Sequence, residues 1–152
     1  MPFMPVPGHV GSDYEGLRPE FRVIPNPFDP SHRVMLVPAI RPELALMHAL
    51  AAAPDGTLLL EPSEDDALLA QASRVVIAST ERIVPREELT QAADGVVLPG
   101  IHVTGVVEAP GGARPTSVRG AYDLDVEHLE AYLAAAADEV AFKDYLARHV
   151  FA

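Results

Sequence analysis

A loop in the last third of the chain places two arginines beside two hydroxyl side chains. Arg114 and Arg119 flank Thr116 and Ser117, and a Pro-Gly-Gly run comes just before them. A guanidinium presents a planar fork of N–H donors that matches the oxygens of a carboxylate or a phosphate. The loop is therefore a candidate oxyanion site. The alternative is a surface loop whose arginines pair with the aspartates a few residues downstream.

A second candidate anion site is the glycine-containing segment at residues 8–13, which reads Gly-His-Val-Gly-Ser-Asp. The backbone N–H groups of Gly11 and Ser12 could face an anion, because glycine lets the main chain approach a phosphate closely. Two glycines at this spacing are a weak signal. We favour the alternative, a structural turn in which Ser12 or Asp13 caps the residues that follow.

The densest acidic run of the chain consists of Glu61, Glu64, Asp65 and Asp66. A carboxylate can serve as a covalent nucleophile. Acidic residues at the start of a helical stretch are also typical of a solvated helix N-terminus, where the helix dipole favours negative charge. We favour this second interpretation.

No metal site is predicted. The six histidines show no spacing that places two of them on one helical face beside a carboxylate, and the sequence has no cysteine. His48 and His102 lie in apolar segments, where a hydrogen-bonded core histidine is more common than a ligand. Without cysteine there is also no disulfide framework and no thiolate nucleophile.

The composition is that of an ordinary folded domain. The chain has 152 residues, of which 49% are hydrophobic and 22% are charged, so we expect a single domain over residues 1–152 with one core. A net charge of −11 without a Lys/Arg cluster argues against nucleic acid and anionic membranes as partners. No apolar stretch approaches the roughly 18 residues of a membrane span, and the start lacks the basic segment of a signal peptide. We therefore expect a cytoplasmic protein.

Strand and helix signals alternate along the chain and predict a mixed α/β fold with strands and helices in three layers. The first thirty residues hold too many prolines and glycines for a long helix and are expected to be extended and looped. The predicted strands are residues 33–38, 44–48, 57–61, 74–80, 95–98 and 102–108.

Local signals add a hairpin, a helix and a buried strand to this prediction. The turn dipeptide Asp55-Gly56 makes residues 44–61 a plausible hairpin. Ser63 and Asp66 resemble a capping box that opens a helix from Glu64 to about Ala72. The segment 74–80 is apolar on both faces, which is typical of a strand buried on both sides.

Three further helices are predicted. Pro85 begins a short helix that runs to about Ala93. Asp125 caps a second, which extends into the helix-favouring alanine run 134–137. The third runs from Glu139 to about His149 and closes the chain.

Several motifs occur in order along the sequence. Residues 113–117 read Ala-Arg-Pro-Thr-Ser, residues 122–125 read Tyr-Asp-Leu-Asp, and residues 145–150 read Tyr-Leu-Ala-Arg-His-Val. Upstream, residues 5–13 read Pro-Val-Pro-Gly-His-Val-Gly-Ser-Asp, residues 37–49 read Val-Pro-Ala-Ile-Arg-Pro-Glu-Leu-Ala-Leu-Met-His-Ala, and residues 81–84 read Glu-Arg-Ile-Val. This set resembles the A subunit of class I coenzyme A transferases of the glutaconate CoA-transferase type. One departure is Arg114, since the family usually has histidine there.

The resemblance implies a fold. In this family the sheet is an open, three-layer α/β sheet, and a complete A subunit begins with a helix and a glycine-rich strand-turn-helix unit. The sequence contains neither, so we expect the C-terminal half of such a subunit with its N-terminal strands missing.

The resemblance also implies a function. The family moves CoA between carboxylic acids, using CoA thioesters as substrates and no permanently bound cofactor. Its nucleophilic glutamate belongs to a partner B subunit, within a Ser-Glu-Asn-Gly type motif that this chain lacks. The resemblance thus predicts no catalytic nucleophile here. The candidates for contact with substrate or CoA are Arg114, Thr116, Ser117, Arg119, Gly11 and Ser12.

Two alternatives stay open at this point. The chain could belong to a related CoA-thioester hydrolase rather than a transferase. It could also be a non-catalytic binding or assembly module that keeps the scaffold, as the arginine at position 114 would suggest.

The missing strands predict that the chain is not a monomer. A sheet without its first strands has an open edge and an uncovered apolar face, and the prolines of residues 1–11 cannot donate ladder hydrogen bonds to repair it. We expect the missing half as a separate chain or a second copy to supply the cover, with Phe3, Met4, Val6 and Val10 as contact candidates. The resemblance also implies a B subunit as a partner. Because CoA is polyanionic, a chain of this net charge should bind it weakly and in a salt-dependent manner.

Overall fold

The chain divides into two compact units, Met1–Arg41 and Pro42–Ala152. The computed structural model describes residues 1–92 and 94–151. The single domain expected from the length of the chain stays a prediction.

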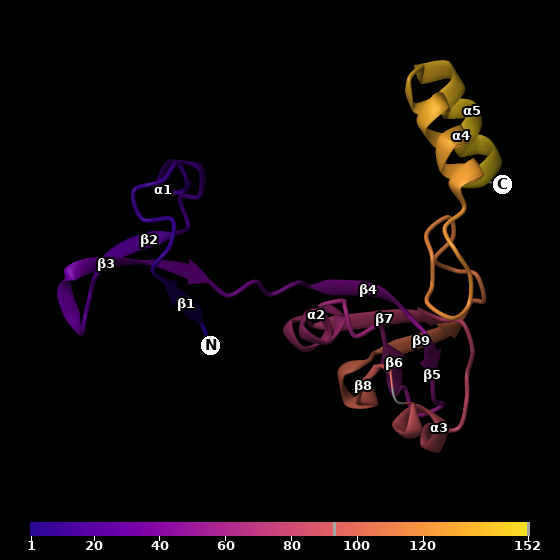
Figure 1. Ribbon diagram of the computed structural model, residues 1–152, viewed down its shortest axis with the longest axis horizontal. Coiled ribbons are helices and arrows are strands. Elements are labelled where there is room, and N and C mark those ends of the chain that lie inside the picture. The colour runs from indigo at the N-terminus through magenta and orange to yellow at the C-terminus, as the bar shows by residue number, and fades with distance from the viewer. Residues whose placement is uncertain (93, 152) are drawn as a thin grey trace. The chain divides into compact units, whose positions relative to one another are not determined.

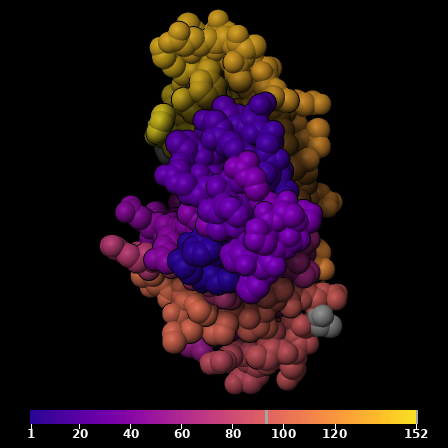
Figure 2. Space-filling view, turned by 90° about the vertical axis from the view of Figure 1, so that its left-hand side faces the viewer, coloured from indigo at the N-terminus to yellow at the C-terminus, as the bar shows by residue number. Residues whose placement is uncertain are grey.

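The first unit is an antiparallel sheet with the strand order β1-β3-β2 (Figure 1). Its strands are β1 (Phe3–Val6), β2 (Arg22–Asn26) and β3 (Asp29–Pro38), and the short helix α1 (Tyr14–Leu17) lies between β1 and β2 in sequence. In the space-filling view the atoms of this unit, coloured indigo to purple, form one continuous mass (Figure 2).

The expectation of an extended, looped entry was therefore only partly right. β1 forms in spite of its proline, with Pro5 opposite Leu36 of β3. β1 is an edge strand, and an edge is where a strand tolerates a missing N–H donor. Phe3 and Met4 are exposed there, with 47% and 53% of their surface accessible.

The second unit contains two three-stranded sheets (Figure 1). In the parallel sheet the order is β4-β7-β9, with strands Leu44–Ala49, Val75–Thr80 and Gly105–Glu108. In the antiparallel sheet the order is β5-β6-β8, with strands Ala51–Ala52, Leu58–Leu60 and Val96–Leu98. The predicted strands 95–98 and 102–108 thus belong to different sheets, separated by the 3₁₀ turn Gly100–His102.

The predicted hairpin over residues 44–61 was wrong in its first strand. The turn at Asp55-Gly56 forms, with Gly56 at φ +85°, but it joins β5 to β6. A single residue, Leu50, separates β4 from β5, and β4 pairs with β7 instead. A parallel pair requires a long crossover connection, here one that includes α2, and local sequence patterns do not reveal such a partner.

In the described residues of the second unit, four further helices follow, namely α2 (Asp66–Ala72), α3 (Arg86–Gln91), α4 (Val126–Ala136) and α5 (Glu139–His149). The predicted Asp125 cap is confirmed, since its Oδ1 accepts a hydrogen bond from the His128 N–H at 3.0 Å. The predicted capping box at Ser63 is wrong, because α2 begins at Asp66 and Asp65 occupies the N-cap without a side-chain bond. Ala93, the expected end of α3, lies outside the described residues.

The main core of the second unit lies between the two sheets and α2. It is built from side chains of β4, β5, β6, β7 and β8 together with Ala70 of α2. The prediction that residues 74–80 form a strand buried on both sides is only half fulfilled, because β7 alternates between buried and half-buried residues. α4 and α5 pack against each other through aromatic rings, with the Tyr132 and Tyr145 centroids 5.5 Å apart. The mixed α/β class expected from the sequence is thereby confirmed. Among the described residues, no helix combines the length and apolarity that crossing a membrane requires.

Gly100 provides a test of this fold. A Cβ built there would lie 2.3 Å from the backbone oxygen of Asp55 and 2.9 Å from the backbone carbon of Gly56. Backbone cannot move aside as a side chain can, so Gly100→Ala should lower the free energy of unfolding by about 1–3 kcal/mol in denaturant titrations. The matched control is Gly105→Ala, whose Cβ meets only the tip of Ile77 at 3.4 Å. Equal effects of the two substitutions would contradict the close packing of this turn.

Candidate functional site

The candidate site lies at the carboxyl edge of the parallel sheet. β4, β7 and β9 run in the same direction, so they end at one edge. His48 and Ser79 lie near the ends of β4 and β7, and Glu81 directly follows β7. The loop 109–125 leaves β9 from the same edge. Ligands of open α/β sheets bind outside the carboxyl ends of the strands.

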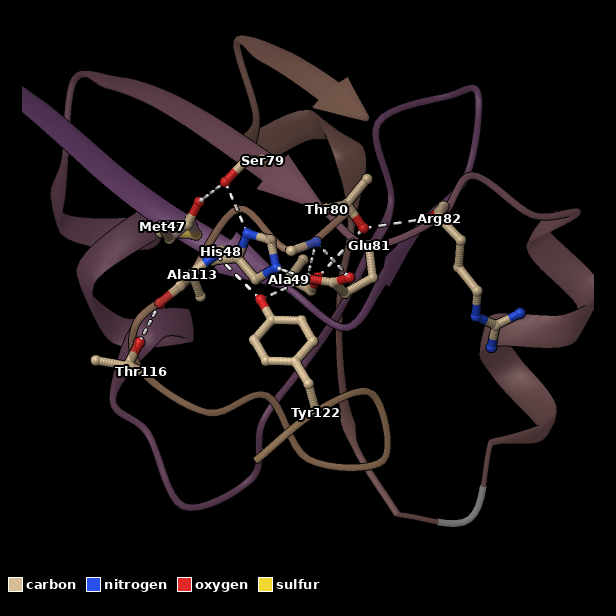
Figure 3. A network of polar contacts seen from close by, with 11 residues as sticks. Met47, His48, Ala49, Ser79, Thr80, Glu81, Arg82, Ala113, Thr116 and Tyr122 are labelled. Atoms are coloured by element: carbon tan, nitrogen blue, oxygen red, sulfur yellow. Dashed lines mark hydrogen bonds and ion pairs between the residues drawn. The ribbon is translucent and has the colours of Figure 1, made fainter. Parts of the chain in front are cut away.

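The Glu81 carboxylate is the centre of a polar network at this edge (Figure 3). Its Oε1 lies 2.7 Å from His48 Nε2 and accepts the Tyr122 hydroxyl at 2.8 Å. The Gly111 N–H donates to Oε2 at 2.9 Å. The side chain of Glu81 is only 12% exposed. One carboxylate thus connects β4, the end of β7 and both arms of the loop 109–125.

His48 is held through both of its ring nitrogens. A carboxylate only accepts hydrogen bonds, so Nε2 carries a proton and donates a hydrogen bond to Glu81. Nδ1 lies 2.8 Å from the Ser79 hydroxyl, which donates to it when the imidazole is neutral. The His48 side chain is 14% exposed. With both nitrogens engaged, His48 has no free ring nitrogen for a ligand, in line with its predicted role as a hydrogen-bonded core histidine.

The network lowers the pKa of Glu81. Burial by itself raises this pKa, but the hydrogen bonds from the Gly111 N–H, the Tyr122 hydroxyl and His48 together outweigh burial. The same contact acts in the opposite direction on Tyr122, whose pKa is raised by burial and by its hydrogen bond to the carboxylate. Glu81 is therefore ionised and Tyr122 is neutral near pH 7.

Gly111 and Gly112 let the backbone of the loop approach Glu81 and His48 closely. Gly111 adopts φ +75°, which lets its N–H point at Glu81. At Gly112 a Cβ would lie 2.8 Å from the backbone oxygen of Ala109 and 3.3 Å from the His48 ring. Only glycine fits between the loop and the histidine. The Tyr122 hydroxyl, while donating to Glu81, accepts the N–H of Ala113 at 3.1 Å.

Arg114 stacks on the aromatic ring that Glu81 holds. Its guanidinium carbon lies 4.5 Å from the centre of the Tyr122 ring. Cation–π stacking uses the face of the guanidinium and leaves its N–H edges available for an anion. Among the described residues no ion pair involves Arg114. Arg114 is exposed and follows the loop residue that binds Tyr122.

A cavity of about 490 Å³ lies beside the network. The end of β4, the segment before α2 and the loop supply its walls, which are Met47, His48, Leu50, Glu61, Ser63, Glu64, Asp66, Ala113, Ser117, Val118 and Arg119. The lining contains more carboxylates than arginines. Burial, together with the nearby Glu64, raises the pKa of Asp66.

The predicted site residues fall into two groups. Ser117 and Arg119 line the cavity, whereas Arg114 and Thr116 do not. Arg119 forms an ion pair with Glu61 at 2.7 Å and also donates to the backbone oxygen of Asp94. The predicted alternative of arginines paired with downstream aspartates does not describe Arg119, since its partner lies far upstream in sequence. The Thr116 hydroxyl donates to the Ala113 backbone oxygen.

Gly11 and Ser12 lie in the first unit, where their polar groups bond locally. The Gly11 N–H donates to Glu15 Oε1 at 2.6 Å, and the Ser12 hydroxyl donates to the His9 backbone oxygen at 2.6 Å. These contacts form the structural turn that we favoured for this segment, but Asp13, at the N-cap of α1, makes no side-chain capping bond. Contact of either residue with a ligand stays a prediction. Among residues 1–92 and 94–151 no cluster of metal-ligating side chains is present.

Neither Glu81 nor Tyr122 was predicted from the sequence as a site residue. Both appeared only within matched motifs. The available signal was their position, because Glu81 is a charged residue directly after a buried strand. Its partners lie 30 to 41 residues away, beyond the reach of local patterns.

The lowered pKa of Glu81 gives a pH-dependent prediction. The folded state binds the Glu81 proton more weakly than the unfolded chain does, so the ionised carboxylate stabilises the fold above the ordinary value of 4.5. This contribution is lost as the pH falls through the folded-state pKa. Glu81→Gln should therefore cost about 1–3 kcal/mol of unfolding free energy at neutral pH, and the difference from wild type should shrink below pH 4.5.

Chemical denaturation from neutral to acidic pH measures this difference. Glu130→Gln, at an exposed position of α4, serves as the control and should change stability little at any pH. A Glu81→Gln cost that stays constant over the whole pH range would contradict the proposed ionised anchor.

Comparisons with known proteins found relatives by sequence and by structure. None of the family models searched matches the chain. The A subunit of glutaconate CoA-transferase from Acidaminococcus fermentans is 34% identical over an alignment of 148 positions, which covers 87% of this chain and 46% of the relative. The cholesterol ring-cleaving hydrolase IpdA subunit of Rhodococcus jostii is 28% identical over 160 residues, covering 99% of this chain and 54% of the relative.

A solved structure shows the same fold. The crystal structure of glutaconate coenzyme A-transferase from Acidaminococcus fermentans superposes with a TM-score of 0.87 and 30% identity, and the match covers 99% of this chain and 53% of that one. The chain therefore spans about half the length of these relatives. By sequence and by fold, the chain belongs to the family of CoA-transferase A subunits.

Proposed function

We propose that the chain is part of the A subunit of a CoA-transferase, or of a related CoA-thioester hydrolase, and that its loop 109–125 forms one wall of an active site completed by a partner chain. The observation that carries this proposal is the anchoring of the loop by Glu81 at the carboxyl edge of the parallel sheet. An anchored loop holds its exposed side chains in fixed positions, which substrate binding requires. The substrate would be a CoA thioester, and no permanently bound cofactor is involved.

The carboxylates of the site are engaged within the protein, which favours a nucleophile on the partner chain. A glutamate that attacks a thioester needs an oxygen free to reach the carbonyl carbon. Both oxygens of Glu81 accept hydrogen bonds, and its lowered pKa makes it a weaker nucleophile. Glu61, another carboxylate of the cavity wall, is paired with Arg119. A glutamate of a partner B subunit is therefore the better candidate.

Arg114 is the best candidate for contact with the substrate. It stacks on Tyr122 and carries N–H groups suited to a phosphate or a carboxylate. The family usually has histidine at this position. Both residue types can donate to an oxyanion, so the change preserves hydrogen-bonding capacity while adding a permanent charge. Arg119 is a weaker candidate because Glu61 already neutralises it.

The Arg119–Glu61 pair favours a second candidate function. The ion pair neutralises Arg119, and the further carboxylates in the cavity wall repel a polyanion such as CoA. A non-catalytic binding or assembly module with the same scaffold would show this lining. Activity in the presence of a B subunit distinguishes the two functions.

The activity assay uses the purified chain with a CoA thioester and an acceptor carboxylic acid. We expect no appreciable turnover by the chain alone, because Glu81 and Glu61 are both engaged within the protein. Turnover of the thioester by transfer or hydrolysis should appear when the chain is assembled with a B-type subunit. Turnover by the chain alone would contradict the partner-borne nucleophile, and an inactive assembly would favour the non-catalytic module.

Binding of CoA tests the role of Arg114 separately. Calorimetry should detect weak binding that falls as salt rises, because the contact is ionic and the chain carries a net charge of −11. Arg114→Ala should weaken it about tenfold, the loss expected for one charge-assisted hydrogen bond. Arg148→Ala on α5 removes the same charge from an exposed position and should leave the affinity within about twofold. Equal losses would assign the effect to net charge alone.

A further inference from the structure

The cavity beside the Glu81 network has an apolar wall. Met47, Leu50 and Val118 line it, and Met47 and Val118 are buried. The volume of about 490 Å³ lies within the range of small-molecule sites. An apolar chain that enters this cavity leaves water for apolar surroundings, which favours its binding.

Carboxylates make up another part of the wall. They belong to Glu61, Glu64 and Asp66, and among the described lining residues only Arg119 carries a permanent positive charge. Glu61 Oε2 accepts the Arg119 Nε–H at 2.7 Å, so the charge of Arg119 is already balanced within the protein. The Arg119 guanidinium is also held by the backbone oxygen of Asp94, which accepts an N–H of Nη2. The cavity wall is therefore net negative.

A further negative charge is unfavourable at this wall. Burial, followed by the nearby Glu64, raises the pKa of Asp66. A raised pKa of a carboxyl group means that its ionised form is disfavoured at that place. A carboxylate carried into the cavity by a ligand meets the same surroundings.

The unpaired guanidinium of the loop lies outside this cavity. Arg114 does not belong to the lining, and it stacks on the Tyr122 ring with its N–H edges available. The charges of the protein therefore separate two kinds of ligand group. Anionic groups are favoured at Arg114, and uncharged apolar groups are favoured in the cavity.

We propose that the cavity receives the acyl chain of the CoA thioester and selects acyl chains that carry no charge, with Glu61 as the specificity-determining residue. This inference rests on the proposed function, since it names the class of acyl group for that site. Glu61 acts by occupying Arg119, which leaves no uncompensated cation in the wall for a terminal carboxylate. The apolar wall then supplies the favourable contact.

An acyl chain with a terminal carboxylate fits the cavity less well. It would have to displace Glu61 from Arg119, and Glu61 competes from within the same chain at a high effective concentration. The displaced Glu61 side chain, which is only 23% exposed, would lose its partner while still partly buried. Glu64 and Asp66 would add repulsion.

Two small probes without CoA test the cavity directly. 4-Methylpentanamide and succinamate have the same arrangement of heavy atoms, but a carboxylate in succinamate replaces the isopropyl end of the amide. NMR titration of the chain with methyl-labelled methionine follows the Met47 methyl group in the cavity wall. We expect 4-methylpentanamide to shift this signal and succinamate to bind about tenfold more weakly or less.

Substitution of Glu61 tests its role in this selection. Glu61→Gln frees Arg119 and should tighten succinamate binding about tenfold, while the affinity for 4-methylpentanamide stays within about twofold. Adding Arg119→Ala to Glu61→Gln should abolish the gain. Glu130→Gln, at an exposed position of α4, makes the same change of net charge and should leave both affinities within about twofold.

Three results would overturn the proposal. They are failure of 4-methylpentanamide to shift Met47, binding of succinamate as tight as that of the amide, and an equal gain in Glu61→Gln and Glu130→Gln. The comparison of the two probes needs no variant, so it decides even if Glu61→Gln fails to fold.

Activity separates this inference from the proposed function. Selective binding of the amide without any turnover of a CoA thioester in the presence of a B subunit would keep the selectivity of the cavity and reject the proposed function. With a B subunit we expect 4-methylpentanoyl-CoA to be turned over faster than succinyl-CoA, which differ in the same way as the probes. Equal turnover of the two thioesters would keep the function and reject the selectivity.

Discussion

The hydrogen bonds accepted by the Glu81 carboxylate hold together segments that are far apart in the sequence. His48 comes from β4, Gly111 and Tyr122 from the two arms of the loop 109–125, and Glu81 itself from the end of β7. A buried carboxylate is stable only when its oxygens are bonded. The loop therefore stabilises the buried carboxylate by donating hydrogen bonds to it, and the carboxylate in turn holds the loop in position. The position of Arg114 depends on the hydrogen bond from Tyr122 to Glu81, because its guanidinium stacks on the Tyr122 ring.

This arrangement separates two roles that a glutamate beside a ligand site could play. We interpret Glu81 as a positioning residue, because both of its carboxylate oxygens accept hydrogen bonds from the protein. Chemistry on a CoA thioester would then require a second, less constrained carboxylate. The engagement of both Glu81 oxygens within the protein supports the proposal of an active site shared between chains.

Local patterns predicted the local features of the structure well. The Asp125 cap, the helix Glu139–His149 and the turn at Gly56 each depend on residues within a few positions of one another. Apart from the capping box at Ser63, which was a local error, the main errors concern partners distant in sequence. Whether β4 pairs with β6 or with β7, and which face of β7 is covered, depend on the whole sheet. The same holds for Glu81, whose role emerges only when strands and loop meet. The motif order nevertheless identified the family, because it samples the whole chain at once.

If Glu81 anchors the loop and does not react, its carboxylate should stay unmodified during turnover. The most direct test is to incubate the chain with a CoA thioester, alone and with a B-type subunit, and then reduce any glutamyl thioester with borohydride. Peptide mass spectrometry then locates the reduced glutamate. We expect modification only on the partner, with every glutamate of this chain unchanged. A reduced Glu81 or Glu61 would contradict the anchoring role.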